Sequence, residues 1–311
     1  MTFALVFPGQ GSQSVGMMDG YGDSSVIRET FAEASEALGE DLWQMVSVGP
    51  AERLALTVNT QPLMLTAGVA AYRAWLAAGG PKPALVAGHS LGEYSALVAA
   101  GALSFADAVP LVRFRAQAMQ EAVPEGEGAM AALMGLEIDD VRAACAEASQ
   151  GEVVDAANLN APGQIVIAGA RAAVERAMTL ATGKGAKRAV LLPVSAPFHC
   201  ALMKPAAQRL SERLMAVAVS KPEIDVLNNV DVVIQNDPEK IRDALVRQAF
   251  SPVRWIESVT VMAERGLTRV VECGPGRVLA AMTRRISKEV EGGSLHDAAS
   301  LEQMLAELGT K

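Results

Sequence analysis

Residues 85–100 read LVAGHSLGEYSALVAA: an apolar run, a Gly-X-Ser-X-Gly motif and a segment of helix-forming residues. This order predicts a strand, a sharp turn and a helix. The two glycines of the motif permit the tight backbone, so the Ser90 hydroxyl is expected to project from the end of the strand over the start of the helix. A serine that only caps the helix is the alternative, but the flanking strand and helix favour a nucleophile.

A serine nucleophile needs a base, and the chain contains only three histidines. His89 precedes Ser90 inside the turn, so its side chain is expected to point away and to be structural. His296 lies in the polar segment 292–297 and is expected on the solvated surface. His199 ends the segment PVSAPFH, between an apolar strand and a helix. By elimination, His199 is predicted to be the base.

No acid is obviously placed to orient this imidazole. The aspartates between Ser90 and His199 are Asp107, Asp139, Asp140 and Asp155. In α/β-hydrolases an acid does lie between the serine and the histidine along the chain, but these four are typical of helix caps or strand flanks. The sequence therefore favours another orienting group, such as a backbone carbonyl.

Strand and helix alternate along the chain, which predicts a parallel sheet covered on both faces. Between residues 126 and 194 the order becomes strand, helix, strand, strand, helix, strand, which is typical of a ferredoxin-like unit. The predicted fold class is α/β: a large parallel-sheet α/β hydrolase-like domain (residues 1–125 and 195–311) with an inserted ferredoxin-like βαββαβ subdomain (residues 126–194). The active site is expected in the cleft between them.

The segment after the insertion is predicted to hold three helices, a strand and a final helix. These are expected near residues 203–217, 238–250, 253–265 and 269–272, and from about residue 277. The last ~20 residues are predicted to form a loosely attached polar tail.

Two polar residues fall on helical faces that are otherwise apolar. The residues three and four positions from Arg115 are Leu111, Val112, Ala118 and Met119. An arginine in such surroundings either snorkels to solvent or is paired in a buried site, and its planar fork fits a carboxylate. Gln248 lies on a helix that is expected to face inward, where a buried amide with local partners is the alternative to a role in the site.

Five motifs occur together and in order. They are FPGQGSQ (7–13), GHSLGE (88–93), NLNAPGQ (158–164), FH (198–199) and ECGPG (272–276). In this combination the chain resembles the malonyl-CoA:acyl carrier protein transacylases, from residue 3 to about residue 286. The resemblance implies that Ser90 is the acyl-accepting nucleophile and His199 its general base.

The resemblance also implies the remaining parts of the site. Arg115 would bind the malonyl carboxylate, and the main-chain carbonyl of Gln248 would orient the base. The main-chain amides of Gln10 and Leu91 would form the oxyanion hole. Met119 and Phe198 are expected in the acyl pocket. Malonyl-CoA and a holo acyl carrier protein would be substrates, and no cofactor is expected.

Bulk properties agree with a cytoplasmic enzyme. The 311 residues are 50% hydrophobic, enough to bury a large core. There is no apolar run of ~18 residues and no basic N-terminal region, so neither a membrane span nor a signal peptide is expected. Three scattered cysteines predict neither a disulfide framework nor a metal site. A cytoplasmic monomer that binds no nucleic acid, membrane or metal is expected.

The net charge of −8 is unfavourable for general attraction of two anionic substrates. Net charge governs general repulsion, whereas a local basic patch governs docking. Three basic clusters offer such a patch: residues 184–188, 204–213 and 284–288. The first two flank His199 along the chain, so Lys187, Arg188 and Lys204 are predicted to dock the carrier. A solvated helix face is the alternative for each cluster.

Three other functions compete with malonyl transfer. A serine hydrolase would use water to resolve the acyl-enzyme, but the missing acid and Arg115 count against it. A related transacylase could serve a polyketide pathway or malonate metabolism with the same chemistry. A non-catalytic scaffold for carrier proteins is disfavoured by the intact set of Ser90, His199 and Arg115.

Overall fold

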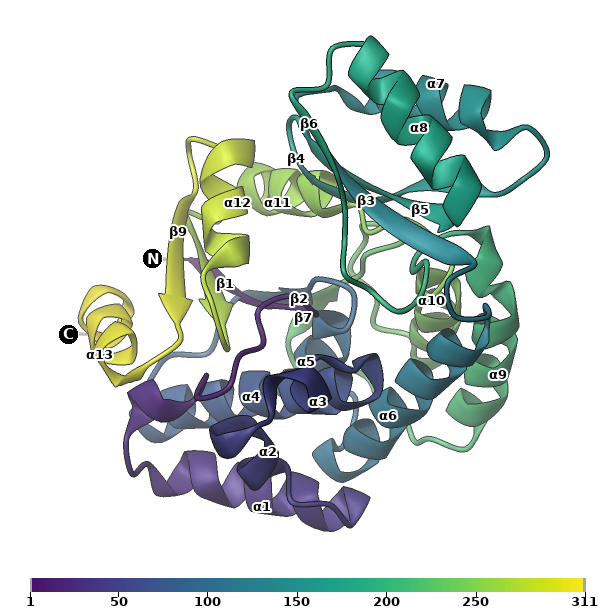
Figure 1. Cartoon of the computed structure of the whole chain (residues 1–311). Helices are drawn as coiled ribbons and strands as arrows, with labels where there is room; N and C mark the ends of the chain where they lie inside the picture. Colours follow the sequence, from purple (N-terminus) through teal and green to yellow (C-terminus); the bar gives the residue numbers. More distant parts are fainter. Residues whose placement is uncertain (1, 310–311) are drawn as a thin grey trace.

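The computed structural model describes residues 2–309, which form two β-sheets surrounded by helices (Figure 1). The larger sheet has the order β7-β2-β1-β8-β9, and all of its pairs are parallel. Its strands are β1 (Phe3–Phe7), β2 (Leu85–Gly88), β7 (Asp225–Leu227), β8 (Arg269–Cys273) and β9 (Glu291–Leu295). The predicted parallel sheet is confirmed, with β7 and β9 as strands that the sequence did not reveal.

Helices cover both faces of this sheet. Those of the amino-terminal part are α1 (Ser25–Leu38), α2 (Leu42–Val48), α3 (Ala51–Ala55), α4 (Thr57–Ala77), α5 (Gly92–Ala99) and α6 (Phe105–Glu121), with the 3₁₀ turn η1 (Asp19–Tyr21). Those of the carboxyl-terminal part are η2 (Ala201–Met203), α9 (Lys204–Met215), α10 (Pro238–Gln248), α11 (Trp255–Glu264), α12 (Val278–Ile286) and α13 (Ala298–Leu308). The helices predicted after residue 200 therefore exist, within a few residues of their expected bounds.

The alternation of side chains along β1 explains the two layers. Phe3, Leu5 and Phe7 belong to a core cluster shared with α1, α4, α5 and α6, whereas Ala4 and Val6 belong to a second cluster shared with α11 and α12. Successive residues of a strand point to opposite faces, so a strand buried on both sides must be apolar throughout. All five residues of β1 are buried.

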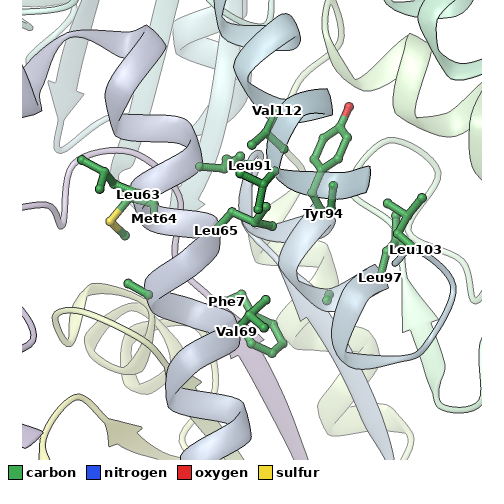
Figure 2. Packing of buried hydrophobic residues seen from close by; sticks show 14 of the residues in the cluster. Phe7, Leu63, Met64, Leu65, Val69, Leu91, Tyr94, Leu97, Leu103 and Val112 are labelled. Carbon is green, nitrogen blue, oxygen red and sulfur yellow. The ribbon is translucent and has the colours of Figure 1, made fainter. Parts of the chain in front are cut away.

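Helix α4 packs against the face of the large sheet that carries Phe3, Leu5 and Phe7. Seventeen of its 21 residues are buried, because it is packed on nearly all sides. Figure 2 shows Leu65 and Val69 of this helix in the cluster that also contains Phe7 and Leu91. Within residues 2–309, neither α4 nor any other helix is long and apolar enough to cross a membrane.

The second sheet is antiparallel and has its own core. Strands β3 (Gly128–Met134), β4 (Val154–Ala161), β5 (Gln164–Ala170) and β6 (Arg188–Leu191) have the order β4-β5-β3-β6. Helices α7 (Ile138–Ser149) and α8 (Arg171–Gly183) pack against this sheet on the side away from the larger one (Figure 1). This arrangement confirms the ferredoxin-like unit; the exact domain boundaries stay a prediction.

The prediction of a loose carboxyl-terminal tail is wrong. Strand β9 pairs with β8, and α13 buries Leu301, Met304 and Leu308. Asp297 caps this helix by accepting a hydrogen bond from the Ser300 amide. The sequence predicts a loose tail here because the strand, EGGSL, lacks the β-branched residues typical of strands. The apolar stripe of α13 is short, and polar residues on either side of it make the helix hard to recognise from the sequence.

A buried contact of α13 can be tested directly. Leu301→Ala is expected to lower the free energy of unfolding by about 2–4 kcal/mol, because it removes a buried side chain and leaves a cavity. Chemical denaturation measures the change. Glu302→Ala, at an exposed position on the same helix, is the control and should stay within about 0.5 kcal/mol of the parent. If Leu301→Ala were as stable as Glu302→Ala, the prediction of a loosely attached tail would be correct after all.

Candidate active site

The candidate nucleophile lies in the turn between β2 and α5. Ser90 has a φ of 52°, in the left-handed region that costs a non-glycine residue roughly 1–2 kcal/mol. A Cβ atom on Gly88 would lie 1.8 Å from the main-chain carbon of Gly92, and one on Gly92 would lie 2.0 Å from the carbonyl oxygen of Phe7. Both glycines are therefore required by close backbone contacts, which is why the motif has this form.

The candidate base meets the serine from a distant part of the chain. The Ser90 hydroxyl and the Nε2 atom of His199 lie 2.7 Å apart. His199 Nδ1 lies 2.9 Å from the main-chain carbonyl oxygen of Gln248. A carbonyl can only accept, so Nδ1 carries the proton and Nε2 is left to accept from the serine. The structure thus brings together the three residues that the sequence singled out, with a carbonyl where a hydrolase has a carboxylate.

The protonation state of the imidazole suits a base. Burial, with a smaller contribution from the charge of Arg115, lowers the pKa of His199 to about 3. The ring is therefore neutral around pH 7, which is the form that can remove a proton from the serine. His199 also has a left-handed φ, of 62°. Strained backbone at both members of a pair is typical of functional sites.

Arg115 is buried beside the serine, and only 2% of its surface is exposed. This burial excludes the snorkelling alternative. Its guanidinium donates to Gln61 Oε1 at 2.8 Å, to Gln248 Oε1 at 3.0 Å and to the Ser90 hydroxyl at 3.2 Å. No carboxylate among residues 2–309 lies within 4 Å of it, so the only direct partners of this buried cation are neutral.

A buried glutamate that the sequence analysis did not single out completes the network. Glu93, in the first turn of α5, is 3% exposed and accepts a 2.8 Å hydrogen bond from Gln248 Nε2. The same Nε2 atom donates to the main-chain carbonyl of Ser90 at 3.0 Å. Burial raises the pKa of Glu93 to about 7. The side chain of Gln248 therefore links Glu93 to Arg115, while its main chain orients His199.

A small cavity opens onto these groups, with a volume of about 120 Å³. Its polar wall consists of Gln10, Gln61, His89, Ser90, Arg115, Asn158 and His199, and its apolar wall of Leu91, Met119, Met130, Leu192, Val194 and Phe198. The two residues predicted for the acyl pocket, Met119 and Phe198, are therefore part of this lining. The small sheet contributes Met130 and Asn158, so the cavity lies between the two sheets, as predicted.

Two main-chain amides at the cavity are available as donors. Those of Gln10 and Leu91 make no hydrogen bond to another residue in the described part of the chain. Gln10 follows β1 and Leu91 follows Ser90, so both lie at the carboxyl edge of the large sheet. Amides in this position fit the predicted oxyanion hole.

The other histidines and the cysteines lie outside this network. His89 bonds to Asn160 through Nε2 at 2.8 Å, and it contributes to the cavity wall. His296 is part-buried against Arg277 rather than fully solvated, since the segment around it is ordered. Cys200, next to His199, is buried, and burial raises its thiol pKa to about 12. Among residues 2–309, no group of His, Cys, Asp and Glu side chains could hold a metal ion.

Two of the predicted docking residues lie away from the candidate base. Arg188 pairs with Met134 at one end of β3, whereas Gly128 at the other end packs against the loop that leads to His199. A seven-residue strand spans roughly 20 Å. Lys187 shares the distant end with Arg188, so proximity along the chain was a poor guide to proximity in space.

Lys204 does lie near the candidate base. It begins α9, is exposed, and lines with His199 an open cavity of about 730 Å³. Lys187, Arg188 and Lys204 have no carboxylate within 4 Å among the residues that the structure describes. Their charges are therefore available to a partner.

The third basic cluster reaches the same end of the small sheet as the first. Arg285, on α12, donates to the carbonyl of Pro162 at 2.9 Å in the turn between β4 and β5. The next residue in that turn, Gly163, accepts from the Gly135 amide, and the Lys187 side chain lies against Gly135. Two basic clusters that are about 100 residues apart in the sequence thus gather around one turn.

Comparison with known proteins agrees with an acyl-transfer site. The acyl transferase domain model matches residues 4–305. The malonyl CoA-acyl carrier protein transacylase of Escherichia coli K12 is 53% identical, over 97% of this chain and 98% of the relative. An acyl-carrier-protein S-malonyltransferase structure from Burkholderia pseudomallei is 60% identical, with a TM-score of 0.97, over 98% of this chain and 100% of that one.

A further solved structure contains a partner. It is a malonyl-transacylase in complex with a holo type II PKS acyl-carrier protein, and it is 50% identical with a TM-score of 0.97, over 99% of this chain and 100% of that one. Full-length matches at these identities, together with the arrangement of Ser90, His199 and Arg115, lead to one conclusion. This chain belongs to the malonyl CoA-acyl carrier protein transacylase family of acyl transferases.

Proposed function

We propose that this protein transfers the malonyl group from malonyl-CoA to the phosphopantetheine thiol of an acyl carrier protein, through a malonyl-serine intermediate, and so supplies fatty acid synthesis. The observation that carries the proposal is the position of Ser90. Its hydroxyl lies 2.7 Å from a neutral imidazole and 3.2 Å from a buried guanidinium that has no carboxylate partner among residues 2–309. Such a site suits an acyl group that carries its own carboxylate.

In the first half-reaction, His199 takes the proton of the Ser90 hydroxyl as the oxygen attacks the thioester carbonyl. The amides of Gln10 and Leu91 donate to the oxyanion that forms, and loss of one such donor typically lowers a rate by ~100- to 1,000-fold. The carbon–sulfur bond then breaks, and the coenzyme A thiolate takes the proton held by His199. Arg115 holds the malonyl carboxylate throughout.

In the second half-reaction, the carrier thiol gives its proton to His199 and attacks the malonyl-serine ester. The serine oxygen leaves, recovers the proton, and the malonyl-thioester carrier departs. The mechanism draws on side chains and main-chain amides, so it includes no metal or redox cofactor. A cytoplasmic, monomeric enzyme remains our proposal for the setting in which these two substrates meet.

The carrier is expected to dock on two groups of basic side chains, one at the cleft and one at the far end of the small sheet. Lys204 lines the cavity that contains His199, and Lys187, Arg188 and Arg285 gather at the far end of the small sheet. Carrier proteins are acidic, so complementary charges steer the encounter despite the net charge of −8.

The acyl-enzyme is the first expected outcome. Brief incubation with malonyl-CoA should raise the intact mass by one malonyl group on the peptide that contains Ser90. Ser90→Ala should abolish both the label and the transfer, because among residues 2–309 the Ser90 hydroxyl is the only nucleophile hydrogen-bonded to the His199 ring. The measurement is mass spectrometry with and without holo carrier, following malonyl-carrier and free malonate separately. A label on Cys200 would overturn the assignment, and release of malonate without transfer would make the protein a hydrolase.

The second expected outcome concerns Arg115. Arg115→Ala leaves the malonyl carboxylate buried without a partner, at a cost of roughly 2–5 kcal/mol. Malonyl transfer should fall at least tenfold, since each ~1.4 kcal/mol is a factor of ten. Acetyl transfer should hold or improve, and Arg115→Lys should restore malonyl transfer only in part.

The control for this prediction is on the same helix. Arg113 is half-buried and bonds to Glu40 with both terminal nitrogens, outside the cavity. Arg113→Ala should therefore leave the malonyl-to-acetyl ratio unchanged. If Arg115→Ala lowers both transfers equally in a folded protein, the carboxylate is held elsewhere.

The third expected outcome concerns docking. Charge reversal at Lys187, Arg188 or Lys204 should raise the apparent KM for the carrier, and leave acylation by malonyl-CoA nearly intact. The effect should shrink as salt rises, because exposed charges are screened within ~8 Å at physiological ionic strength. Lys82→Glu, before the amino end of β2 and so at the opposite edge of the sheet, is the control. Equal losses in both half-reactions would assign these residues to coenzyme A binding or to folding.

A further inference from the structure

The turn that carries Ser90 has two main-chain groups whose partners come from one distant side chain. Asn229, on the loop after β7, accepts from the Ser90 amide through Oδ1 at 2.7 Å. Its Nδ2 donates to the carbonyl of Gly88 at 2.6 Å. The amide of Ser90 has no other partner among the described residues. One asparagine side chain therefore holds the backbone on both sides of His89, directly before the left-handed Ser90.

The asparagine is itself held in place. Asn229 is completely buried, and its own amide donates to Glu93 Oε2 at 3.0 Å. That oxygen also accepts from Gln248, whose side chain donates to the carbonyl of Ser90. The turn, the loop after β7 and the end of α10 are thus joined in one closed set of hydrogen bonds. A left-handed serine persists only where its surroundings determine its conformation, and this set supplies that determination.

We propose that Asn229 is a positioning residue for the nucleophile: it fixes the backbone of Ser90 so that the hydroxyl lies between His199 and Arg115. A direct consequence concerns the oxyanion hole. Because the Ser90 amide is committed to Asn229, the turn offers the following amide, that of Leu91, to the substrate oxygen. The inference rests on the proposed function only in taking Ser90 as the nucleophile.

The test measures the reactivity of Ser90 without either substrate. The probe is phenylmethylsulfonyl fluoride, which reacts with activated serines, and the quantity is the second-order rate constant of inactivation. Asn229→Ala should lower this constant at least tenfold, because the amide of Ser90 and the carbonyl of Gly88 lose their shared partner. The ratio of malonyl to acetyl transfer should stay unchanged, since the hydrogen bonds of Arg115 to Gln61 and Gln248 do not involve Asn229. The inactivation rate constant thus reports on the position of the nucleophile, and the malonyl-to-acetyl ratio reports on the selection of the acyl group.

The neighbouring residue is a matched control. Asn228 is also buried, and its Oδ1 accepts from the amides of Asp231 and Val232 on the same loop. Asn228→Ala should lower the melting temperature to a similar extent and leave the inactivation rate within about threefold. A wild-type rate in folded Asn229→Ala would overturn the proposal, as would equal rate losses in the two variants at equal loss of stability.

A second variant decides the matter if Asn229→Ala does not fold. In Asn229→Asp the protonated carboxyl reproduces the asparagine, with a carbonyl for the Ser90 amide and a hydroxyl for the Gly88 carbonyl. Its ionised form has no donor. The rate constant of inactivation of Asn229→Asp, divided by that of wild type at the same pH, should therefore rise at least threefold as the pH falls from 8 to 5.5.

Other ionisable groups near this position are common to both proteins. They are Glu93 in contact, and the Asp231–Arg247 and Arg254–Glu257 pairs of the adjoining segments. Because wild type carries all of these groups, the effect of their titration largely cancels in the ratio of the variant's rate constant to that of wild type. A flat ratio across this pH range would refute the role of Asn229. Loss of malonyl transfer with normal serine reactivity would instead count against the proposed function.

Discussion

The left-handed backbone of Ser90 is the constraint on which the rest of the site depends. It lets only three residues separate the end of a strand from the start of a helix, and it lifts the hydroxyl clear of the sheet. Gly88 and Gly92 make the turn sterically possible, since neither position has room for a Cβ atom. The conformation costs roughly 1–2 kcal/mol, which burial and hydrogen bonds around the turn must offset.

The second constraint is electrostatic, and Arg115 illustrates it. A buried cation without a charged partner is costly, and among residues 2–309 the guanidinium of Arg115 bonds only to amide and hydroxyl oxygens and lies over the ring of Tyr94. The nearest compensating charge, Glu93, acts through the amide of Gln248. On the proposed function, a substrate carboxylate would reach the guanidinium without first displacing a protein carboxylate, and its binding would relieve the cost of the isolated charge.

Sequence reasoning was most informative where the pattern is local. The glycine motif singled out Ser90, the scarcity of histidines singled out His199, and the structure places these two side chains in contact. The apolar neighbours of Arg115 left burial or snorkelling open, and the structure shows burial. Sequence reasoning failed where contacts are long-range: Asn229 lies 139 residues after Ser90, and an Asn-Asn pair in a loop is typical of an ordinary turn. Strand β9 was missed because a glycine-rich edge strand has little β-propensity, although β8 pairs along its whole length. Lys187 and Arg188 lie about a dozen residues before His199 in the sequence, but they are at the opposite end of the small sheet from it.

The carbonyl that orients His199 follows from the same electrostatics. In a hydrolase triad a carboxylate stabilises the imidazolium, but here the acyl group would bring a second anion into the same small cavity of about 120 Å³. Two like charges so close in a low dielectric repel strongly. A neutral carbonyl from Gln248 fixes the tautomer of the base without that repulsion, and Glu93 stays behind the Gln248 side chain. On the proposed function, the site thus leaves its buried cation, Arg115, to the substrate, and the base needs no acid between Ser90 and His199 to orient it.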